Sequence, residues 1–394
     1  MIKNSNLVSA IIIAISIIGS FLTLLIPKAP YVYIGLIWTA AVLFISLKSK
    51  KGFIKLIGIY LAVIILAFTL FEGYLWLKSN QLYITDKITP DYYRVDKFLG
   101  YAPKKGIKIF EKKYYKDELV FDAKYSFDEN GLRISPPFVE SDVKGCILFF
   151  GCSFTYGQGV NDSETMPYQV GIKSHGKYHI YNFGVKGYGP HQMLSELEHN
   201  VVKNIVNSNG STYAIYQAIP EHINRAAGLA FWDYYGPKYI LGKNKEVRYA
   251  GNFDDYTVFP KKILKYLNES LIYRNILGNA RFFDDNKDID LYEGIVIAAK
   301  EIFEKQYPGG EFHIMFWDNI SSAGEISQNL RWMKVLKFFS EKGLNIHLVS
   351  KILPDYQNNR SKFRLSPYDS HPSALAHKLI AEYVVQNILK EEFH

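Results

Sequence analysis

The sequence predicts an α/β protein in which helices cover both faces of a parallel sheet, preceded by membrane-spanning helices. Two observations lead to this fold class. After about residue 145, short apolar runs alternate with segments of helical periodicity, which favours a parallel sheet between layers of helices. The first eighty residues instead hold long apolar runs with few charges, which is typical of helices in a bilayer.

Three apolar runs near the amino terminus are the candidate spans: Leu7–Ile26, Tyr31–Leu47 and Leu56–Leu77. A helix of about 20 residues crosses a bilayer core about 30 Å thick. We expect the first run to remain uncleaved, because no small-residue cleavage site precedes Pro27. The alternatives are a cleavable signal peptide and a buried helical hairpin of a soluble protein.

Lysines in the loops predict the orientation of these spans. The loop Lys48–Lys55 carries four lysines, whereas the loop between the first two runs carries only Lys28. Short loops rich in lysine stay in the cytoplasm. We therefore expect a multi-pass protein of the cell inner membrane, with everything after about Lys78 on the outer, extracytoplasmic side.

Three parts of the chain are expected: a membrane anchor at 1–80, a connecting segment at 81–143 and a catalytic domain at 144–394. The connecting segment should form short strands, and Asn130-Gly131 in it favours a tight turn. An aromatic, irregular insertion at about 227–285 interrupts the large domain. It is either a lid or acceptor-binding element, or a surface excursion packed on its own aromatic side chains.

Strands and helices are expected to alternate through the large domain. The expected strands are Cys146–Phe150, Tyr178–Phe183, Tyr213–Ala218, His313–Trp317 and Ile346–Val349. The expected helices are Met166–Ser174, His191–Asn204, Ile295–Tyr307, Gln328–Lys342 and Ser373–Leu389. Sheets of this kind place their sites at the carboxyl ends of the strands.

Three polar blocks carry residues suited to acyl transfer. Ser153 directly follows the first strand, so its hydroxyl should lie at the rim of the sheet, where backbone N–H groups can bind an oxyanion. The glycine-rich turn after the second strand offers the amide of Gly187 as a further donor. Near the carboxyl terminus, Asp369 precedes His371 by two residues and can orient its imidazole to accept the serine proton. Taken singly, the blocks fit ordinary turns, a helix cap and a surface histidine equally well.

Together the blocks resemble those of SGNH/GDSL hydrolases. Gly151–Phe154 resembles the first block, Asn182–Gly187 the second and Asp369–Pro372 the last. In the last block a single residue, Ser370, stands between Asp and His, where the family commonly has two. The resemblance covers about Gly145–Leu389. It implies a flavodoxin-like three-layer α/β/α domain.

The same resemblance implies roles for individual residues. Ser153 would be the nucleophile, His371 the base and Asp369 its orienting carboxylate. The amides of Ser153 and Gly187 would form the oxyanion hole.

Two features depart from the family pattern. Glu221 stands where the third block usually has an oxyanion-binding Asn, so that His222 or a water would have to replace it. Glu221, His222 and Asn224 are possible substrate-binding residues. Cys152 occupies the usual position of Asp and is a rival nucleophile, but its side chain should point away from the rim. Cys146 lies about 20 Å away along the strand, too far for a disulfide with Cys152.

The expected function is serine-dependent ester hydrolysis, by an acyl esterase or deacetylase acting on an acylated envelope glycan or a lipid-linked substrate. One alternative is an O-acyltransferase that modifies a surface polysaccharide with a membrane acyltransferase partner. Another is a non-catalytic glycan-binding or scaffold protein. The net charge is +8, but the lysines are scattered and no nucleic-acid motif is present, so no nucleic-acid partner is expected. No metal or other cofactor is expected, because the histidines lack ligand spacing.

Overall fold

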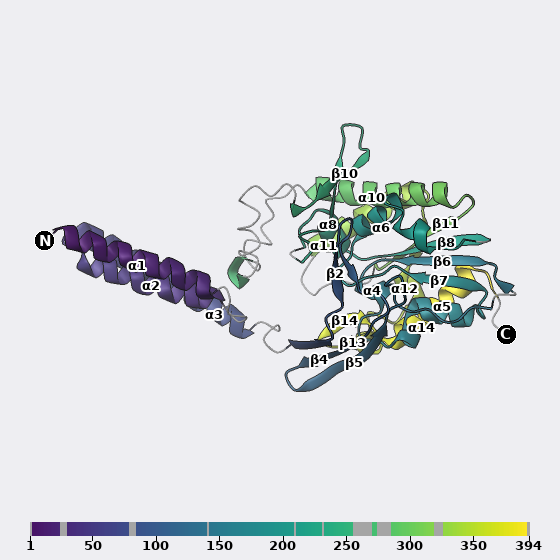
Figure 1. Ribbon diagram of the computed structural model, residues 1–394, viewed down its shortest axis with the longest axis horizontal. Helices are drawn as coiled ribbons and strands as arrows, with labels where there is room; N and C mark the ends of the chain where they lie inside the picture. The colour runs from purple at the N-terminus through teal and green to yellow at the C-terminus, as the bar shows by residue number, and fades with distance from the viewer. Residues whose placement is uncertain are drawn as a thin grey trace. The chain divides into compact units, whose positions relative to one another are not determined.

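The computed structural model describes residues 2–23, 30–78, 84–139, 142–208, 210–230, 232–254, 270–273, 285–318 and 326–391 (Figure 1). The chain divides into two compact units. The first contains residues 1–84 and 258–282, and the second contains residues 85–257 and 283–394.

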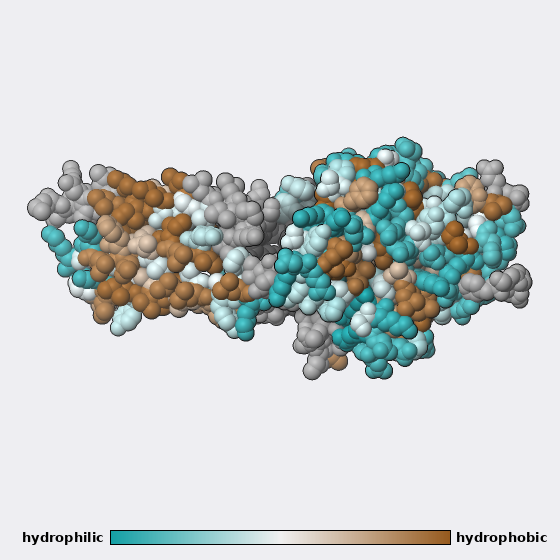
Figure 2. Space-filling model, turned by 90° about the horizontal axis from the view of Figure 1, so that it is seen from below, coloured by the Kyte–Doolittle hydropathy of each residue, from teal (hydrophilic) through white to brown (hydrophobic). Residues whose placement is uncertain are grey.

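The first unit consists mainly of three helices, α1 (Ile2–Thr23), α2 (Pro30–Lys48) and α3 (Gly52–Lys78). Large apolar side chains cover its surface, as the brown area of the helical unit in Figure 2 shows. Phe68 and Leu70, for example, are more than half exposed. A soluble protein rarely exposes so large an apolar surface, whereas a lipid-facing helix requires one.

Two helices are long and apolar enough to cross a membrane, over Tyr31–Lys48 and Gly52–Lys78. The sequence prediction of three spans is therefore wrong in number for the described part of the chain. Among the side chains that the structure describes, the apolar stretch of α1 extends over Val8–Ser20. A stretch of that length is shorter than a bilayer core requires.

A carboxylate near the end of α3 receives a segment from the insertion. Glu72 is buried, and it accepts hydrogen bonds from the hydroxyl of Ser270 at 2.9 Å and from the N–H groups of Leu271 at 2.6 Å and Ile272 at 2.8 Å. The buried charge is thus satisfied by the start of a short helical turn. A large part of the predicted insertion, residues 231, 255–269 and 274–284, lies outside the described residues.

The second unit is built on a five-stranded parallel sheet, which confirms the predicted fold class. Its order is β12-β11-β8-β6-β7, with the first strand along the chain, β6, between the second and the third. This is the flavodoxin-like order. The strands are β6 (Gly145–Phe150), β7 (Tyr178–Asn182), β8 (Ser211–Ala218), β11 (Glu311–Phe316) and β12 (Asn345–Leu348). All five lie where the apolar runs predicted them.

Alternation along the strands makes two cores. Cys146, Leu148 and Phe150 of β6 face one core with α6 (Pro190–Glu198), α10 (Asp285–Gln306) and α11 (Ile326–Glu341). Ile147 and Phe149 face the other core, with α5 (Met166–Lys173) and α14 (Ala374–Tyr383). Successive side chains of a strand point to opposite faces, so a strand covered on both sides must be apolar throughout.

Two of the predicted helices differ in extent. The segment expected as one helix over His191–Asn204 is α6 followed by α7 (Val201–Ile205), because Asn200 between them adopts a left-handed conformation. α10 begins at Asp285, ten residues before the expected start at Ile295, with Ile289 and Tyr292 already in the core.

The connecting segment forms a small β module. A three-stranded sheet has the order β1-β4-β5, and β2 pairs with β3. The strands are β1 (Ile84–Thr89), β2 (Tyr93–Asp96), β3 (Gly100–Pro103), β4 (Lys108–Tyr115) and β5 (Glu118–Ser126). The module has its own core, which includes Tyr92, Tyr125 and, from the main domain, Tyr156. The described part of the insertion adds a hairpin of β9 (Pro237–Leu241) and β10 (Val247–Asn252).

Candidate active site

Ser153 lies directly beyond the carboxyl end of the central strand. β6 ends at Phe150, and Ser153 begins the short helix α4 (Ser153–Tyr156). Gly151 between them has φ +144°, and a Cβ there would lie 2.4 Å from Oγ1 of Thr155. Only glycine therefore permits this sharp exit from the strand. Because β6 separates β7 from β8, Ser153 occupies the switch point where ligands bind in sheets of this order.

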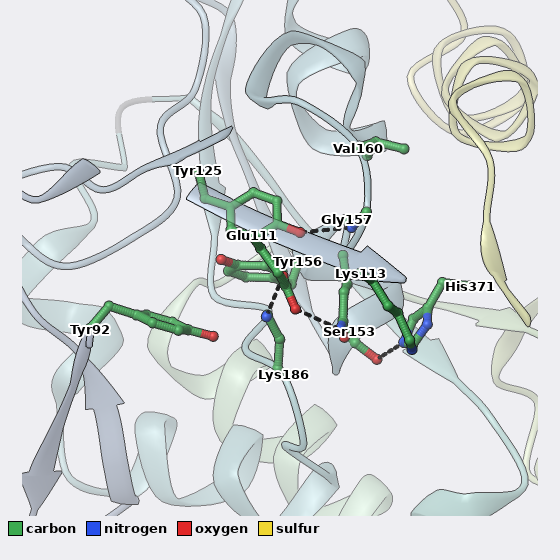
Figure 3. Close-up of polar contacts among 12 residues, drawn as sticks. Tyr92, Glu111, Lys113, Tyr125, Ser153, Tyr156, Gly157, Val160, Lys186 and His371 are labelled. Carbon is green, nitrogen blue, oxygen red and sulfur yellow. Dashed lines mark hydrogen bonds and ion pairs between the residues drawn. The ribbon is translucent and has the colours of Figure 1, made fainter. Parts of the chain in front are cut away.

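The structure brings Ser153, His371 and Asp369 together. Figure 3 shows the contact between Ser153 and His371. His371 Nε2 lies 2.8 Å from Ser153 Oγ, and His371 Nδ1 lies 2.6 Å from Asp369 Oδ1. The backbone N–H of His371 donates to the same carboxylate oxygen at 2.9 Å. A hydroxyl, an imidazole and a carboxylate in this sequence form the arrangement that activates a serine.

A hairpin before the last helix presents the histidine. β14 (Asp369–Pro372) pairs antiparallel with β13 (Arg364–Ser366). Ser373 caps α14, since its hydroxyl accepts from the N–H of Ala376 at 3.3 Å. Asp369 is therefore not the helix cap that the sequence left open, and its carboxylate is directed to His371.

The carboxylate of Asp369 stays ionised although it is almost fully buried. Burial by itself would raise the pKa of Asp369, but the hydrogen bond and charge of His371 and the ammonium of Lys113 hold it well below its usual range. Lys113 Nζ contacts Asp369 Oδ2 at 2.7 Å. Both carboxylate oxygens thus have hydrogen-bond partners, and that of Oδ2 is the Lys113 ammonium.

The turn after β7 is held on both sides. The side chain of Asn182 accepts from the N–H of Gly184 at 3.0 Å and donates to the carbonyl of Thr155 at 3.2 Å, which links this turn to the one carrying Ser153. Gly187 has φ +84°, and a Cβ there would meet the hydroxyl of Tyr101 at 2.5 Å and Nε1 of Trp232 at 2.6 Å. Glycine is thus required at this position.

The amide of Gly187 has a fixed direction. The carbonyl of Lys186 accepts from the hydroxyl of Tyr101 at 2.8 Å, and N–H and C=O of one trans peptide point in opposite directions. The N–H of Gly187 therefore points away from Tyr101. Within the part of the chain that the structure describes, neither this N–H nor that of Ser153 has a hydrogen-bond acceptor. Both are available to bind a ligand oxygen.

The third block does not supply a side-chain donor in the form the sequence suggested. His222 is fully buried, with Nδ1 2.6 Å from the hydroxyl of Tyr216, and burial together with the charges of Arg225 and His191 holds the pKa of His222 well below its usual value. The ring of His222 thus belongs to the core, and the structure does not bring it to Ser153.

The other two candidates of the third block lie on α8 (Glu221–Ala226). Asn224 accepts from Arg331 at 3.3 Å. Glu221 is half-buried, and no hydrogen bond joins it to the triad among the described residues. Neither is brought to Ser153 by a contact in this structure.

Cys152 belongs to the core that faces α5 and α14 and is fully buried, as is Cys146. Burial raises the pKa of the Cys146 thiol to about 11. The rival interpretation of Cys152 as the nucleophile has no geometric support, because the hydroxyl of Ser153, and not this thiol, lies against Nε2 of His371.

Several residues around the site were not anticipated from the sequence. Arg133 is buried and donates to the carbonyls of Tyr156, Gly157 and Val160 at 2.6 to 2.7 Å, which holds the loop after the nucleophile. Glu111 and Lys113 reach the site from β4. Every second side chain of β4 faces inward, and Glu111 and Lys113 share that face. Only the pairing register of the strand could have identified which of its lysines faces inward.

A Ser-His-Asp chain at the carboxyl edge of a parallel sheet in flavodoxin-like order defines the class of this domain: it is an α/β domain with a serine, histidine and carboxylate lined up at the switch point of its sheet. No protein-family profile matches the chain, and no curated protein matches it.

Several solved structures are similar to the domain. A lipolytic protein of the G-D-S-L family from Veillonella parvula shares 12% identity at TM-score 0.36, covering 62% of this chain and 98% of that one. A putative lipolytic protein of that family from Desulfitobacterium hafniense shares 13% at TM-score 0.35, covering 61% and 97%. A catalytic mutant of an acetylxylan esterase from Geobacillus stearothermophilus shares 13% at TM-score 0.36, covering 64% and 96%. Similarity at this level assigns no activity, so the chemistry is inferred from the site itself.

Proposed function

We propose that this protein is a serine-dependent ester hydrolase that works through an acyl-enzyme. The observation that carries the proposal is the chain of short contacts from Ser153 through His371 to Asp369, 2.8 and 2.6 Å long. Ser153 lies at the switch point of the sheet, and the ring of His371 is partly exposed there. A buried structural cluster would not need an exposed imidazole next to a hydroxyl.

The geometry supports the following sequence of steps. His371 Nε2 takes the proton of the Ser153 hydroxyl as Oγ attacks the ester carbonyl carbon. The carbonyl oxygen becomes an oxyanion, which the N–H groups of Ser153 and Gly187 stabilise. The C–O bond to the alcohol then breaks, and His371 returns the proton to the leaving alkoxide. Water, deprotonated by His371, releases the acid and restores Ser153.

We further propose that the site faces away from the cytoplasm and acts on an acylated glycan or lipid-linked substrate of the envelope. Lys50 and Lys51 lie between the two candidate spans, and Lys48 and Lys55 lie in the helix ends beside them, so this end of the helix pair should remain inside. The chain after α3 then emerges outside whether or not α1 crosses the bilayer. A membrane anchor in the same chain favours substrates of the envelope.

A labelling experiment tests the proposed function. The full chain, purified in detergent, should react with a fluorophosphonate probe and hydrolyse 4-nitrophenyl acetate. Ser153→Ala should abolish both, whereas the exposed Ser163→Ala should change neither. Absence of labelling in the wild type would favour a non-catalytic glycan-binding or scaffold protein. Labelling with slow hydrolysis, accelerated by adding an acetyl-accepting glycan, would favour an O-acyltransferase.

A further inference from the structure

The strand β4 turns one face toward the active site. Its exposure alternates, with Ile109 and Glu111 buried and Lys113 largely buried, while Lys108 and Lys112 are exposed. This period of two places Glu111 and Lys113 on the same side of the strand. Two charged side chains on a buried face require partners, and both find them in the main domain.

Lys113 meets the carboxylate of the triad. Its ammonium lies 2.7 Å from Asp369 Oδ2, while Oδ1 of the same carboxylate serves the ring and the backbone N–H of His371. The side chain of Asp369 is 1% exposed and that of Lys113 13%. A carboxylate whose two oxygens are both held by charge-assisted contacts cannot rotate freely about its Cβ–Cγ bond.

Glu111 gives independent evidence that β4 docks onto the site. Its Oε2 accepts from Lys186 Nζ at 2.6 Å, and its Oε1 accepts from Gln158 at 3.2 Å. Lys186 directly precedes Gly187 in the turn of the expected oxyanion hole. Figure 3 shows the contact between Glu111 and Lys186, with Ser153 in the same view. The same strand therefore contacts Asp369 of the triad through Lys113, and through Glu111 it contacts the turn that carries Gly187.

We propose that Lys113 is a positioning residue of the active site: it fixes the carboxylate of Asp369 so that Oδ1 stays aimed at Nδ1 of His371. The inference rests on the proposed function. Under this proposal the β module contributes a residue to the active site and does more than connect the two units. The rate of the chemical step, more than substrate binding, should then depend on a side chain that does not touch the substrate.

The ammonium also affects the charge balance of the site. Asp369 shares its negative charge between His371 and Lys113, so Lys113 disfavours a second positive charge on the imidazole. Removing the ammonium should let His371 hold its proton at higher pH, which moves the acid limb of the pH–rate profile upward. Among the described residues, the other titratable groups around the cluster include Asp86 on β1, Glu111 on β4, Lys186 in the turn after β7 and, interacting with the charge of His371, His377 on α14.

The test compares two lysines on one strand. In the full chain with 4-nitrophenyl acetate, Lys113→Met should lower kcat about tenfold or more at unchanged KM, because the imidazole loses its alignment. The midpoint of the acid limb of the pH–rate profile should move to a higher pH, by about half a pH unit or more. Lys113→Arg should restore most of kcat and the original limb. Lys112→Met, which removes an exposed ion pair with Asp122, should behave as the wild type.

Two results would overturn the inference. The first is that Lys113→Met has the same kcat, and the same midpoint of the acid limb, as the control Lys112→Met. The second is an equal loss of activity at every pH with a lowered Tm and no recovery in Lys113→Arg, which would indicate a purely structural ion pair.

A readout that needs no turnover separates this inference from the proposed function. In the Ser153→Ala background, the NMR titration midpoint of the His371 ring should rise on Lys113→Met and stay constant on Lys112→Met. If the wild type neither labels nor hydrolyses the ester, the proposed function fails, and this midpoint still decides whether Lys113 acts on His371. An unchanged midpoint would contradict the charge coupling.

Discussion

The domain contains two Asp-His pairs with the same 2.6 Å separation and very different surroundings. His371 and Asp369 lie at the rim, and the second ring nitrogen of His371 meets a serine hydroxyl. His191 and Asp233 are both fully buried, and Asp233 also accepts from Gln192 at 2.8 Å. The buried pair joins the insertion to the start of α6.

A short Asp-His contact therefore does not by itself define a catalytic site. The rim pair differs in having its free nitrogen directed at a nucleophile on an accessible edge of the sheet. Nδ1 of His191 has no hydrogen-bond partner among the described residues, so this pair has nothing to activate. The contrast predicts that substitutions in one pair change the rate and substitutions in the other change stability.

The largest effect is expected for His371→Gln. Loss of the general base should lower kcat/KM for 4-nitrophenyl acetate by about ten-thousandfold or more, as for other serine hydrolases that lose a triad member. Thermal unfolding should shift little, because the ring is partly exposed. Retention of a tenth of the wild-type rate would remove His371 from the mechanism.

Asp369→Asn should have the next largest effect, a loss of about a thousandfold or more in kcat. The amide keeps the shape of the carboxylate but favours the wrong imidazole tautomer, and it leaves the ammonium of Lys113 without its charge partner. Steady-state kinetics at saturating ester would measure the loss. A change confined to KM would argue against an orienting role.

Asp233→Asn tests the buried pair. The protein should lose about 2 kcal/mol of unfolding free energy, since His191 and Gln192 lose a charged acceptor in the core. The specific activity of the folded fraction should stay within a few-fold of the wild type. Differential scanning calorimetry and ester kinetics on the same sample would measure both. A large loss of rate without loss of stability would reverse the assignment of the two pairs.

A smaller, pH-dependent effect should distinguish the pairs further. The pKa of Asp369 is depressed in the folded state, so its ionisation contributes stability that is fully present above the ordinary pKa near 4. This contribution is lost progressively as the pH falls below that value toward the folded pKa. The difference in unfolding free energy between wild type and Asp369→Asn, of order 1 kcal/mol from ionisation, should shrink from pH 7 to pH 3. A constant difference would contradict the depressed pKa.

The strand positions, and the blocks that carry the triad residues, were predictable because their signals are local. A run such as Cys146–Phe150 is apolar at every position because both of its faces are covered, and Ser153 follows it directly. Asp369 and His371 belong to one four-residue strand, so their contact needs no long-range information.

The residues around the triad could not be predicted, because they lie on chain segments that come together only in the folded protein. Lys113 and Lys112 look alike in a lysine-rich segment, and only the pairing of β4 with β5 decides which faces the site. The fate of His222 could not be predicted either, because its burial depends on Tyr216 of β8 and on Arg225 in the same helix. Of the three expected spans, two are found among the described residues.

The wide separation of the active-site residues along the chain has a consequence for folding. The contact between Ser153 and His371 spans 218 residues, and that between Lys113 and Asp369 spans 256. Contacts of such long range form late, after the local helices and hairpins. We therefore expect a newly made chain to remain inert until its last hairpin has docked, and the onset of serine labelling to report the completion of folding.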